Sequence, residues 1–155
     1  DVIRSDGSRT GIQYIYRDDT LFMLTPGGAR MTYHRPRIYP HEQSWRGLGI
    51  SYEGWNTNPK NGGYGWITKD LYGGRQAENV TQHVARNIQM HAIENLEAAG
   101  YPVVMHTYDE VVCEVPESFG SVTELESLMT TLPAWAKDWP IKAAGGWEAR
   151  NYRKG

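Results

Sequence analysis

Residues 101–116 read YPVVMHTYDEVVCEVP and carry the clearest structural signal in the second half of the chain. Two β-prone apolar runs, residues 103–105 and 111–115, flank the polar residues 106–110. Apolar runs separated by a short polar segment are typical of a β-hairpin. The stretch therefore predicts an antiparallel hairpin whose tip carries the adjacent carboxylates of Asp109 and Glu110.

A long helix is predicted before this hairpin, over residues 75–99. Apolar side chains recur at every fourth position there, which is the spacing of one helix face. The positions are Val80, Val84, Ile88, Ala92 and Leu96. Gly100 is a natural helix stop, and Pro102 cannot extend the helix.

A second helix and a last strand are predicted after the hairpin. Ser121 and Glu124 have the spacing of a capping box, which opens a helix. That helix is expected to bury three apolar side chains, those of Val122, Leu125 and Met129. Residues 140–144, PIKAA, predict a final strand.

The first half carries strand and turn signals. Residues 13–16 and 21–24 are short apolar runs. After a Pro-Gly-Gly turn, residues 29–33 can return as a partner strand, and residues 34–37 extend that strand. Residues 45–74, rich in Gly, Asn and Pro, predict a long irregular loop. The order of elements predicts an α+β fold.

Composition narrows the classes of function. The 155 residues suffice for one domain with a core, and the net charge of −2 gives no electrostatic signature of nucleic-acid binding. A local basic patch remains compatible with that total. Cys113 is the single cysteine, so no disulfide can form within the chain and a reducing compartment is favoured. Because Cys113 lies in an apolar run, we expect its side chain to be a buried hydrophobic group and not a nucleophile. No apolar run approaches the roughly 20 residues that span a bilayer, so no membrane partner is expected.

Asp109 and Glu110 are the candidate catalytic pair. A carboxylate fixed on a rigid hairpin suits Mg²⁺, which takes one or two carboxylates together with substrate phosphates. Asp and Glu are also ordinary turn residues, so the pattern by itself leaves both interpretations open. The polar helix face with Arg75, Asn79 and Gln82 is similarly either a solvated surface or a set of donors to nucleic acid.

Residues 101–116 resemble motif C of the family A DNA polymerases, in which Val-His-Asp-Glu lies between two apolar strands. Residues 72–87, YGGRQAENVTQHVARN, are similar to a helix of the bacteriophage branch of that family. Residues 24–30 resemble its fingers hairpin, and residues 50–54 and the closing residues 146–153 also resemble that branch. The matches occur in the family's order and cover most of the chain.

The resemblance implies that residues 1–71 are part of the fingers and residues 72–155 a C-terminal palm segment. It places Asp109 on the aspartate that binds Mg²⁺, with Glu110 the carboxylate beside it. The implied reaction is attack of a primer 3′-hydroxyl on a deoxynucleoside triphosphate, in the host-cell cytoplasm if the protein is phage-encoded. The resemblance implies that three helix residues contact primer–template DNA, namely Arg75, Asn79 and Gln82. Tyr108 stands where the motif has His, and stacking or hydrogen bonding at the primer terminus is expected of it.

The chain also departs from the family's pattern. No Asp-Tyr-Ser-like strand and no Arg-x-x-x-Lys helix occur in it, so the other catalytic aspartate and the triphosphate clamp of the family have no counterpart. Asn87 stands where Asp is common. One carboxylate cannot assemble a two-metal site. The expectation is a segment that needs an N-terminal polymerase portion, with exposed apolar surface that favours that partner or a homo-oligomer.

Other classes of function stay open at this point. One is a non-catalytic nucleic-acid-binding or scaffold module on the same fold. Another is an aromatic platform, for example for carbohydrate, because flat rings with polar tips suit wet binding surfaces. Its candidate rings are Trp45, Trp55, Tyr64 and Trp66.

Overall fold

The computed structural model describes residues 11–42, 44, 46–58, 60 and 62–152. The chain divides into two compact units, Asp1–Val84 and Ala85–Gly155. The boundary between the two units falls within a helix, α1 (Gly73–Ala98). The resemblance implied a boundary between residues 71 and 72 instead. The division into compact units does not test the assignment to fingers and palm, which stays a prediction.

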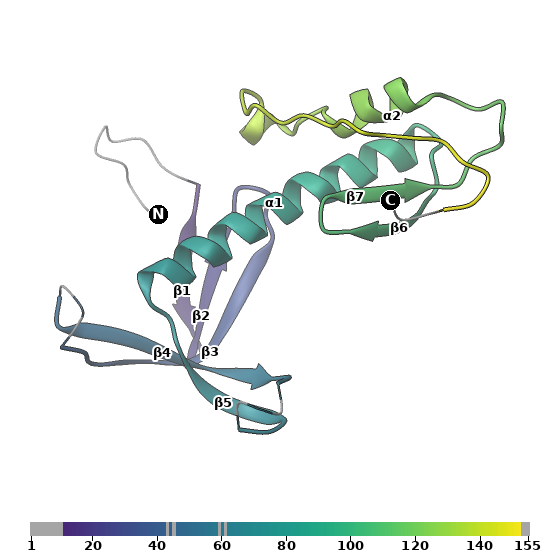
Figure 1. The fold of residues 1–155 in the computed structure, drawn as a ribbon. Coiled ribbons are helices and arrows are strands. Elements are labelled where there is room, and N and C mark those ends of the chain that lie inside the picture. Colours follow the sequence, from purple (N-terminus) through teal and green to yellow (C-terminus); the bar gives the residue numbers. More distant parts are fainter. Residues whose placement is uncertain (1–10, 43, 45, 59, 61, 153–155) are drawn as a thin grey trace. The chain divides into compact units, whose positions relative to one another are not determined.

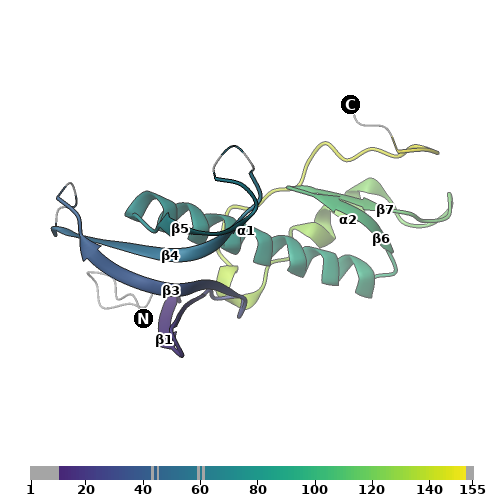
Figure 2. The same ribbon diagram turned by 90° about the horizontal axis from the view of Figure 1, so that it is seen from below.

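The first unit contains a five-stranded antiparallel sheet, in which the strands lie in chain order (Figures 1 and 2). The strands are β1 (Gln13–Arg17), β2 (Thr20–Leu24), β3 (Arg30–Pro40), β4 (Leu48–Asn56) and β5 (Gly65–Asp70). The first three are the strands predicted from the sequence. With the helices described below they confirm the α+β class.

The turn between β1 and β2 consists of Asp18 and Asp19, which both have positive φ, 51° and 56°. A two-residue turn with this sign at both positions matches the right-handed twist of the strands it joins, and Asp tolerates the left-handed region. The pair Arg17 and Thr20 closes the turn. Local chemistry alone therefore fixes the register of this hairpin.

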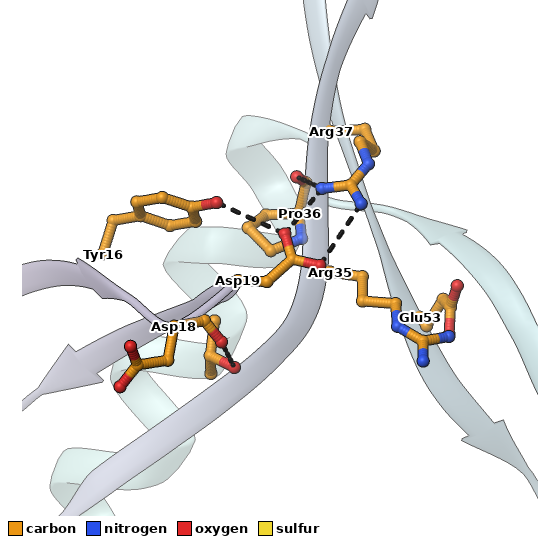
Figure 3. Close-up of polar contacts among 8 residues, drawn as sticks. Tyr16, Asp18, Asp19, Arg35, Pro36, Arg37 and Glu53 are labelled. Atoms are coloured by element: carbon orange, nitrogen blue, oxygen red, sulfur yellow. Dashed lines mark hydrogen bonds and ion pairs between the residues drawn. The ribbon is translucent and has the colours of Figure 1, made fainter.

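Ion pairs on β3 connect it to its neighbours (Figure 3). The register of β3 against β4 shifts between His34 and Arg37, which marks a β-bulge. On either side of Pro36, Arg35 donates to Glu53 of β4 at 2.9 Å and Arg37 donates to Asp19 at 2.7 Å. The bulge thus lets two arginines close together in sequence reach carboxylates on different elements.

The prediction of an irregular loop over residues 45–74 was wrong, because β4 and β5 form a hairpin there. The wrong prediction came from glycines that lie inside these strands and not in turns. A Cβ on Gly49 would lie 2.7 Å from Cζ of Tyr39, its direct partner on β3. Gly49 is therefore a packing residue, which short-range pattern cannot distinguish from a turn residue. Pro59 and Asn61 of the predicted loop lie outside the described residues.

The core of the first unit lies on one face of this sheet. Met23, Tyr33 and Leu71 are fully buried, and Val80 of α1 packs against them. The Tyr33 ring meets Tyr52 edge to face at 5.1 Å. The beginning of α1 is thus attached to the sheet through its apolar stripe.

Helix α1 confirms the predicted long helix and ends as its sequence indicates. Gly100 has φ 87°, its backbone N–H donates to Glu97 O, and the N–H of Tyr101 donates to Leu96 O. These two bonds form a Schellman motif, which requires a residue that adopts positive φ readily. Val84, Ala92 and Leu96 of the predicted stripe are buried.

The second unit contains the predicted hairpin, with strands β6 (Val103–Thr107) and β7 (Glu110–Cys113). The predicted helix is also present, as α2 (Val122–Met129), and a short 3₁₀ helix, η2 (Ala134–Ala136), follows it. Val122, Leu125 and Met129 are half-buried, less than the sequence predicted. The strand predicted at residues 140–144 was wrong, because these described residues join no sheet. Pro140 lacks the N–H that a ladder needs.

The N-terminus of α2 extends the predicted capping box through a third residue. The Ser121 hydroxyl accepts from the N–H of Glu124, as predicted. The Glu124 carboxylate accepts from the buried Tyr101 hydroxyl at 2.7 Å, and that hydroxyl in turn accepts from the N–H of Ser121 at 3.2 Å. Burial, followed by the hydrogen bond to Glu124, raises the pKa of Tyr101.

Among the described residues, no helix combines the length and apolar character that crossing a membrane requires.

Candidate active site

The acidic hairpin turns more tightly than the sequence suggested. Thr107 and Glu110 are the closing pair, so Tyr108 and Asp109 alone form the turn and Glu110 already belongs to β7. Tyr108 has φ 51° and 94% of its surface is exposed. A bulky residue in the left-handed region costs backbone energy, and such positions concentrate at functional sites. The tip therefore presents an open aromatic ring directly beside a carboxylate.

Asp109 and Glu110 have different surroundings. Asp109 lies in the turn and is exposed, whereas Glu110 is half-buried at the start of a strand. Oε1 of Glu110 accepts a hydrogen bond of 3.1 Å from the Tyr152 hydroxyl. Asp109 is thus the more accessible carboxylate for a cation.

The fit of these residues to Mg²⁺ is that of a partial site. Within residues 11–152, leaving aside positions 43, 45, 59 and 61, no three His, Cys, Asp or Glu side chains gather as a metal cage. Mg²⁺ is commonly held by one or two carboxylates, with water and substrate phosphates completing its shell. Asp109 can supply one such oxygen, and the other ligands would come from substrate and from a further carboxylate.

The predicted DNA-binding residues of the helix, Arg75, Asn79 and Gln82, lie on one face of α1, because their spacing is three to four residues. Gln82 is exposed, and the guanidinium of Arg75 lies over the Tyr72 ring at 5.5 Å. These residues belong to the first unit, and the acidic hairpin belongs to the second.

Asn79 has a structural partner that the sequence did not indicate. Its side-chain N–H donates to the hydroxyl of the buried Tyr33 at 2.9 Å. Burial raises the pKa of Tyr33, while this hydrogen bond lowers it. Part of the hydrogen-bonding capacity of Asn79 is thus used inside the unit, and its side-chain oxygen and second side-chain N–H remain for a ligand.

Exposed aromatic rings gather on β3, β4 and β5. Trp55 and Trp66 are direct cross-strand partners whose rings meet edge to face at 6.0 Å, and His34 meets Trp66 at 5.5 Å. Trp55 is 53% exposed and Trp66 57%. Tyr64 is 73% exposed, and Trp45 lies outside the described residues. Two of the predicted platform rings are therefore in contact.

Cys113 is half-buried in β7, and burial raises the pKa of its thiol. A raised pKa disfavours the thiolate, which is the reactive form. The environment agrees with the prediction of a small hydrophobe.

Sequence reasoning missed Tyr152 as a contact of the candidate site. Its position in the closing segment contributed to the resemblance, but no local signal relates it to Glu110. The two residues are 42 positions apart, and only the fold brings them together.

Comparison with known proteins identifies a phage DNA polymerase that is similar to this chain. The chain is 32% identical, over 135 residues, to the DNA polymerase of Bacillus phage SP02. The similarity covers 87% of this chain and 20% of that polymerase, so the chain spans about a fifth of the relative's length. It supports a relationship to a segment of a DNA polymerase. No family model matches the chain, and no solved structure matches it significantly.

Proposed function

We propose that this chain is a C-terminal segment of a template-directed DNA polymerase of the bacteriophage family A type. The observation that carries the proposal is the similarity to a phage DNA polymerase over 87% of the chain. It is supported by the acidic turn between two apolar strands, which has the form that the resemblance to motif C implies. Residues 1–71 would then belong to the fingers and residues 72–155 to the palm.

Asp109 would hold a catalytic Mg²⁺, since it is the exposed carboxylate of the turn. When bound, Mg²⁺ in such sites activates the primer 3′-hydroxyl and stabilises the departing pyrophosphate. Glu110 would support the site from the adjacent strand position. The remaining catalytic carboxylate would come from an N-terminal polymerase portion.

Primer–template DNA would be bound by the exposed ring of Tyr108 and by the polar face of α1. Tyr108 can stack on the terminal base pair, because every base offers an aromatic face. Arg75, Asn79 and Gln82 can donate to phosphates and to minor-groove acceptors. Deoxynucleoside triphosphates would be the second substrate, and a phage-encoded enzyme would act in the host-cell cytoplasm.

The N-terminal polymerase portion is the partner proposed for the apolar surface. Large apolar side chains are exposed on both units, among them Ile38 (72%), Tyr72 (58%) and Val104 (57%). Exposed apolar groups are expected where a segment normally packs against the remainder of a larger protein. In its absence, the same surface would favour a homo-oligomer, which light scattering over a concentration series detects.

Primer extension with Mg²⁺ tests the proposal. The chain would be assayed alone, with an N-terminal polymerase portion, and as a chimera in which it replaces the matching segment of the phage SP02 polymerase. Incorporation is expected only in the last two arrangements. Asp109→Asn should reduce it at least about a hundredfold, since a metal ion contributes several kcal/mol to such a transition state.

Asp18→Asn is the matched control, because Asp18 is also an exposed carboxylate in a two-residue hairpin turn. It should leave incorporation unchanged. Full activity of the chain alone, or of Asp109→Asn, would refute the proposal.

A non-catalytic nucleic-acid-binding module is the second candidate, favoured by the contact between Trp55 and Trp66. The bases of single-stranded nucleic acid stack on such rings. The ring of His34 contacts Trp66, which in turn contacts Trp55, and Arg35 and Arg37 are close to His34 in the sequence. Under this alternative, an oligonucleotide would quench tryptophan fluorescence in the Asp109→Asn variant as well. The quenching would weaken in Trp55→Ala and Trp66→Ala. Quenching by a sugar and not by DNA would instead support a carbohydrate platform.

A further inference from the structure

The last described residues of the chain return to the candidate catalytic hairpin. We call residues 146–152 the C-terminal arm. In Figure 1 the yellow end of the chain comes back beside β6 and β7. The arm ends with the Tyr152 hydroxyl donating to Oε1 of Glu110 at 3.1 Å. Glu110 follows Asp109 directly, so the arm contacts the neighbour of the proposed metal ligand.

The other end of the arm is attached to α2. The backbone N–H of Gly146 donates to Oε1 of Glu126 at 3.0 Å. A Cβ on Gly146 would lie 2.6 Å from Cγ1 of Val122, closer than real Cβ contacts come. Glycine at this position therefore allows the backbone to lie directly against the helix. The attachment fixes where the arm starts on its way to β7.

The Tyr152 ring is also held within the arm. It stacks on the Trp147 ring, with centroids 6.2 Å apart and an interplanar angle of 23°. Stacked aromatic pairs at such separations attract each other. The Tyr152 side chain therefore has a partner within the arm for its ring and a partner on β7 for its hydroxyl.

We infer that Tyr152 is a positioning residue for Glu110, and through it for the acidic turn. The inference rests on the proposed function. The phenol proton occupies one oxygen of the Glu110 carboxylate and fixes its orientation, so Asp109 is left as the carboxylate directed to a metal ion. The same hydrogen bond raises the pKa of Tyr152, which keeps the donor protonated.

Tyr152→Phe tests this inference, because it removes the hydroxyl and keeps the ring that stacks on Trp147. In the polymerase chimera, kcat should fall about tenfold, as expected for a modest misplacement of a catalytic group. The KM for primer–template should stay unchanged, since Tyr152 is not proposed to touch DNA. In the Glu110→Ala background, which removes the acceptor of the Tyr152 hydroxyl, Tyr152→Phe should have little further effect.

Tyr16→Phe is the matched control. Tyr16 also donates its hydroxyl to a carboxylate at a two-residue hairpin turn, that of the turn residue Asp19 at 3.3 Å, in the other unit. Its loss should leave kcat unchanged. Equal losses for both Tyr variants, or a loss that persists in full in the Glu110→Ala background, would overturn the inference and indicate general destabilisation.

A second readout does not depend on activity. With 3-fluorotyrosine at position 152 of the full chain, the ¹⁹F resonance should shift on Glu110→Ala and not on Asp18→Asn. An active chimera that is insensitive to Tyr152→Phe, or a resonance insensitive to Glu110→Ala, overturns the role of Tyr152 and leaves the proposed function standing. A chimera without incorporation at any Mg²⁺ concentration overturns the proposed function, and the inference with it.

Discussion

Arg37 holds Asp19 with both terminal nitrogens of its guanidinium, Nη1 donating to Oδ1 at 2.7 Å and Nη2 to Oδ2 at 3.3 Å. The contact joins the first turn of the sheet to its third strand, 18 positions away (Figure 3). The hydrogen bond from Arg37 holds the pKa of Asp19 below its ordinary value. Folding therefore favours the ionised carboxylate at this position.

Stability of the first unit should consequently decrease in acid. A carboxyl whose pKa is lowered by folding contributes stability above its unfolded pKa, about 3.9, and loses it as the pH falls through the folded value. Asp19→Asn should lower the urea midpoint at pH 7 and reduce its change between pH 5 and pH 2. Asp18→Asn tolerates the same positive φ and should retain the acid sensitivity of the wild type. An unchanged pH profile in Asp19→Asn would contradict this explanation.

Tyr108→Gly should separate stability from function. The left-handed φ of 51° suits glycine, so the substitution should raise the free energy of unfolding by about 0.5 to 1 kcal/mol. Loss of the ring should weaken binding of primer–template by the chimera, measured by fluorescence anisotropy. Asp18→Gly, at the same φ in the other hairpin, is the control and should not affect DNA binding. A destabilised Tyr108→Gly variant would contradict the backbone cost assigned to Tyr108, and unchanged affinity for primer–template would contradict the proposed stacking of its ring.

Gly120→Ala should destabilise the second unit by more than about 2 kcal/mol. Gly120 has φ 65°, and a Cβ there would overlap the Tyr101 hydroxyl that links Ser121 to Glu124. The left-handed backbone alone accounts for about 1 to 2 kcal/mol. Gly145→Ala isolates that backbone contribution, since Gly145 has φ 81° and nothing within 4 Å. Equal losses for the two variants in chemical denaturation would argue against the close approach to Tyr101.

Asn79 should contribute both to the stability of the first unit and to DNA binding. The Tyr33→Phe variant should separate these two contributions. Removing the Tyr33 hydroxyl leaves the Asn79 donor without its partner, and should cost about 1 kcal/mol of stability. It should leave the affinity of the chimera for primer–template unchanged. Asn79→Ala should lower both stability and affinity, whereas Gln82→Ala, at an exposed position, should lower affinity alone. Equal affinities for Asn79→Ala and the wild type would assign Asn79 to the fold only.

Elements whose signals are local could be predicted from the amino-acid sequence. The hairpin of β6 and β7, the long helix with its stop at Gly100, and the cap at Ser121 depend on residues within a few positions of one another. Periodicity and turn chemistry record such short-range preferences directly. The α+β class and the adjacent carboxylates at the hairpin followed from the same information.

Contacts between segments distant in the sequence depend on the tertiary fold and could not be predicted from local pattern. Gly49 belongs to a strand because the Tyr39 ring occupies the space of a side chain, and Asn79 meets a hydroxyl 46 positions away. Residues 140–144, whose apolar content predicted a strand, join no sheet. A strand exists only when another strand supplies its hydrogen bonds, and a buried polar group selects whichever partner the fold brings near. The contact of Tyr152 with Glu110 is of this kind: the sequence supplies both groups, and the path of the chain brings them to 3.1 Å.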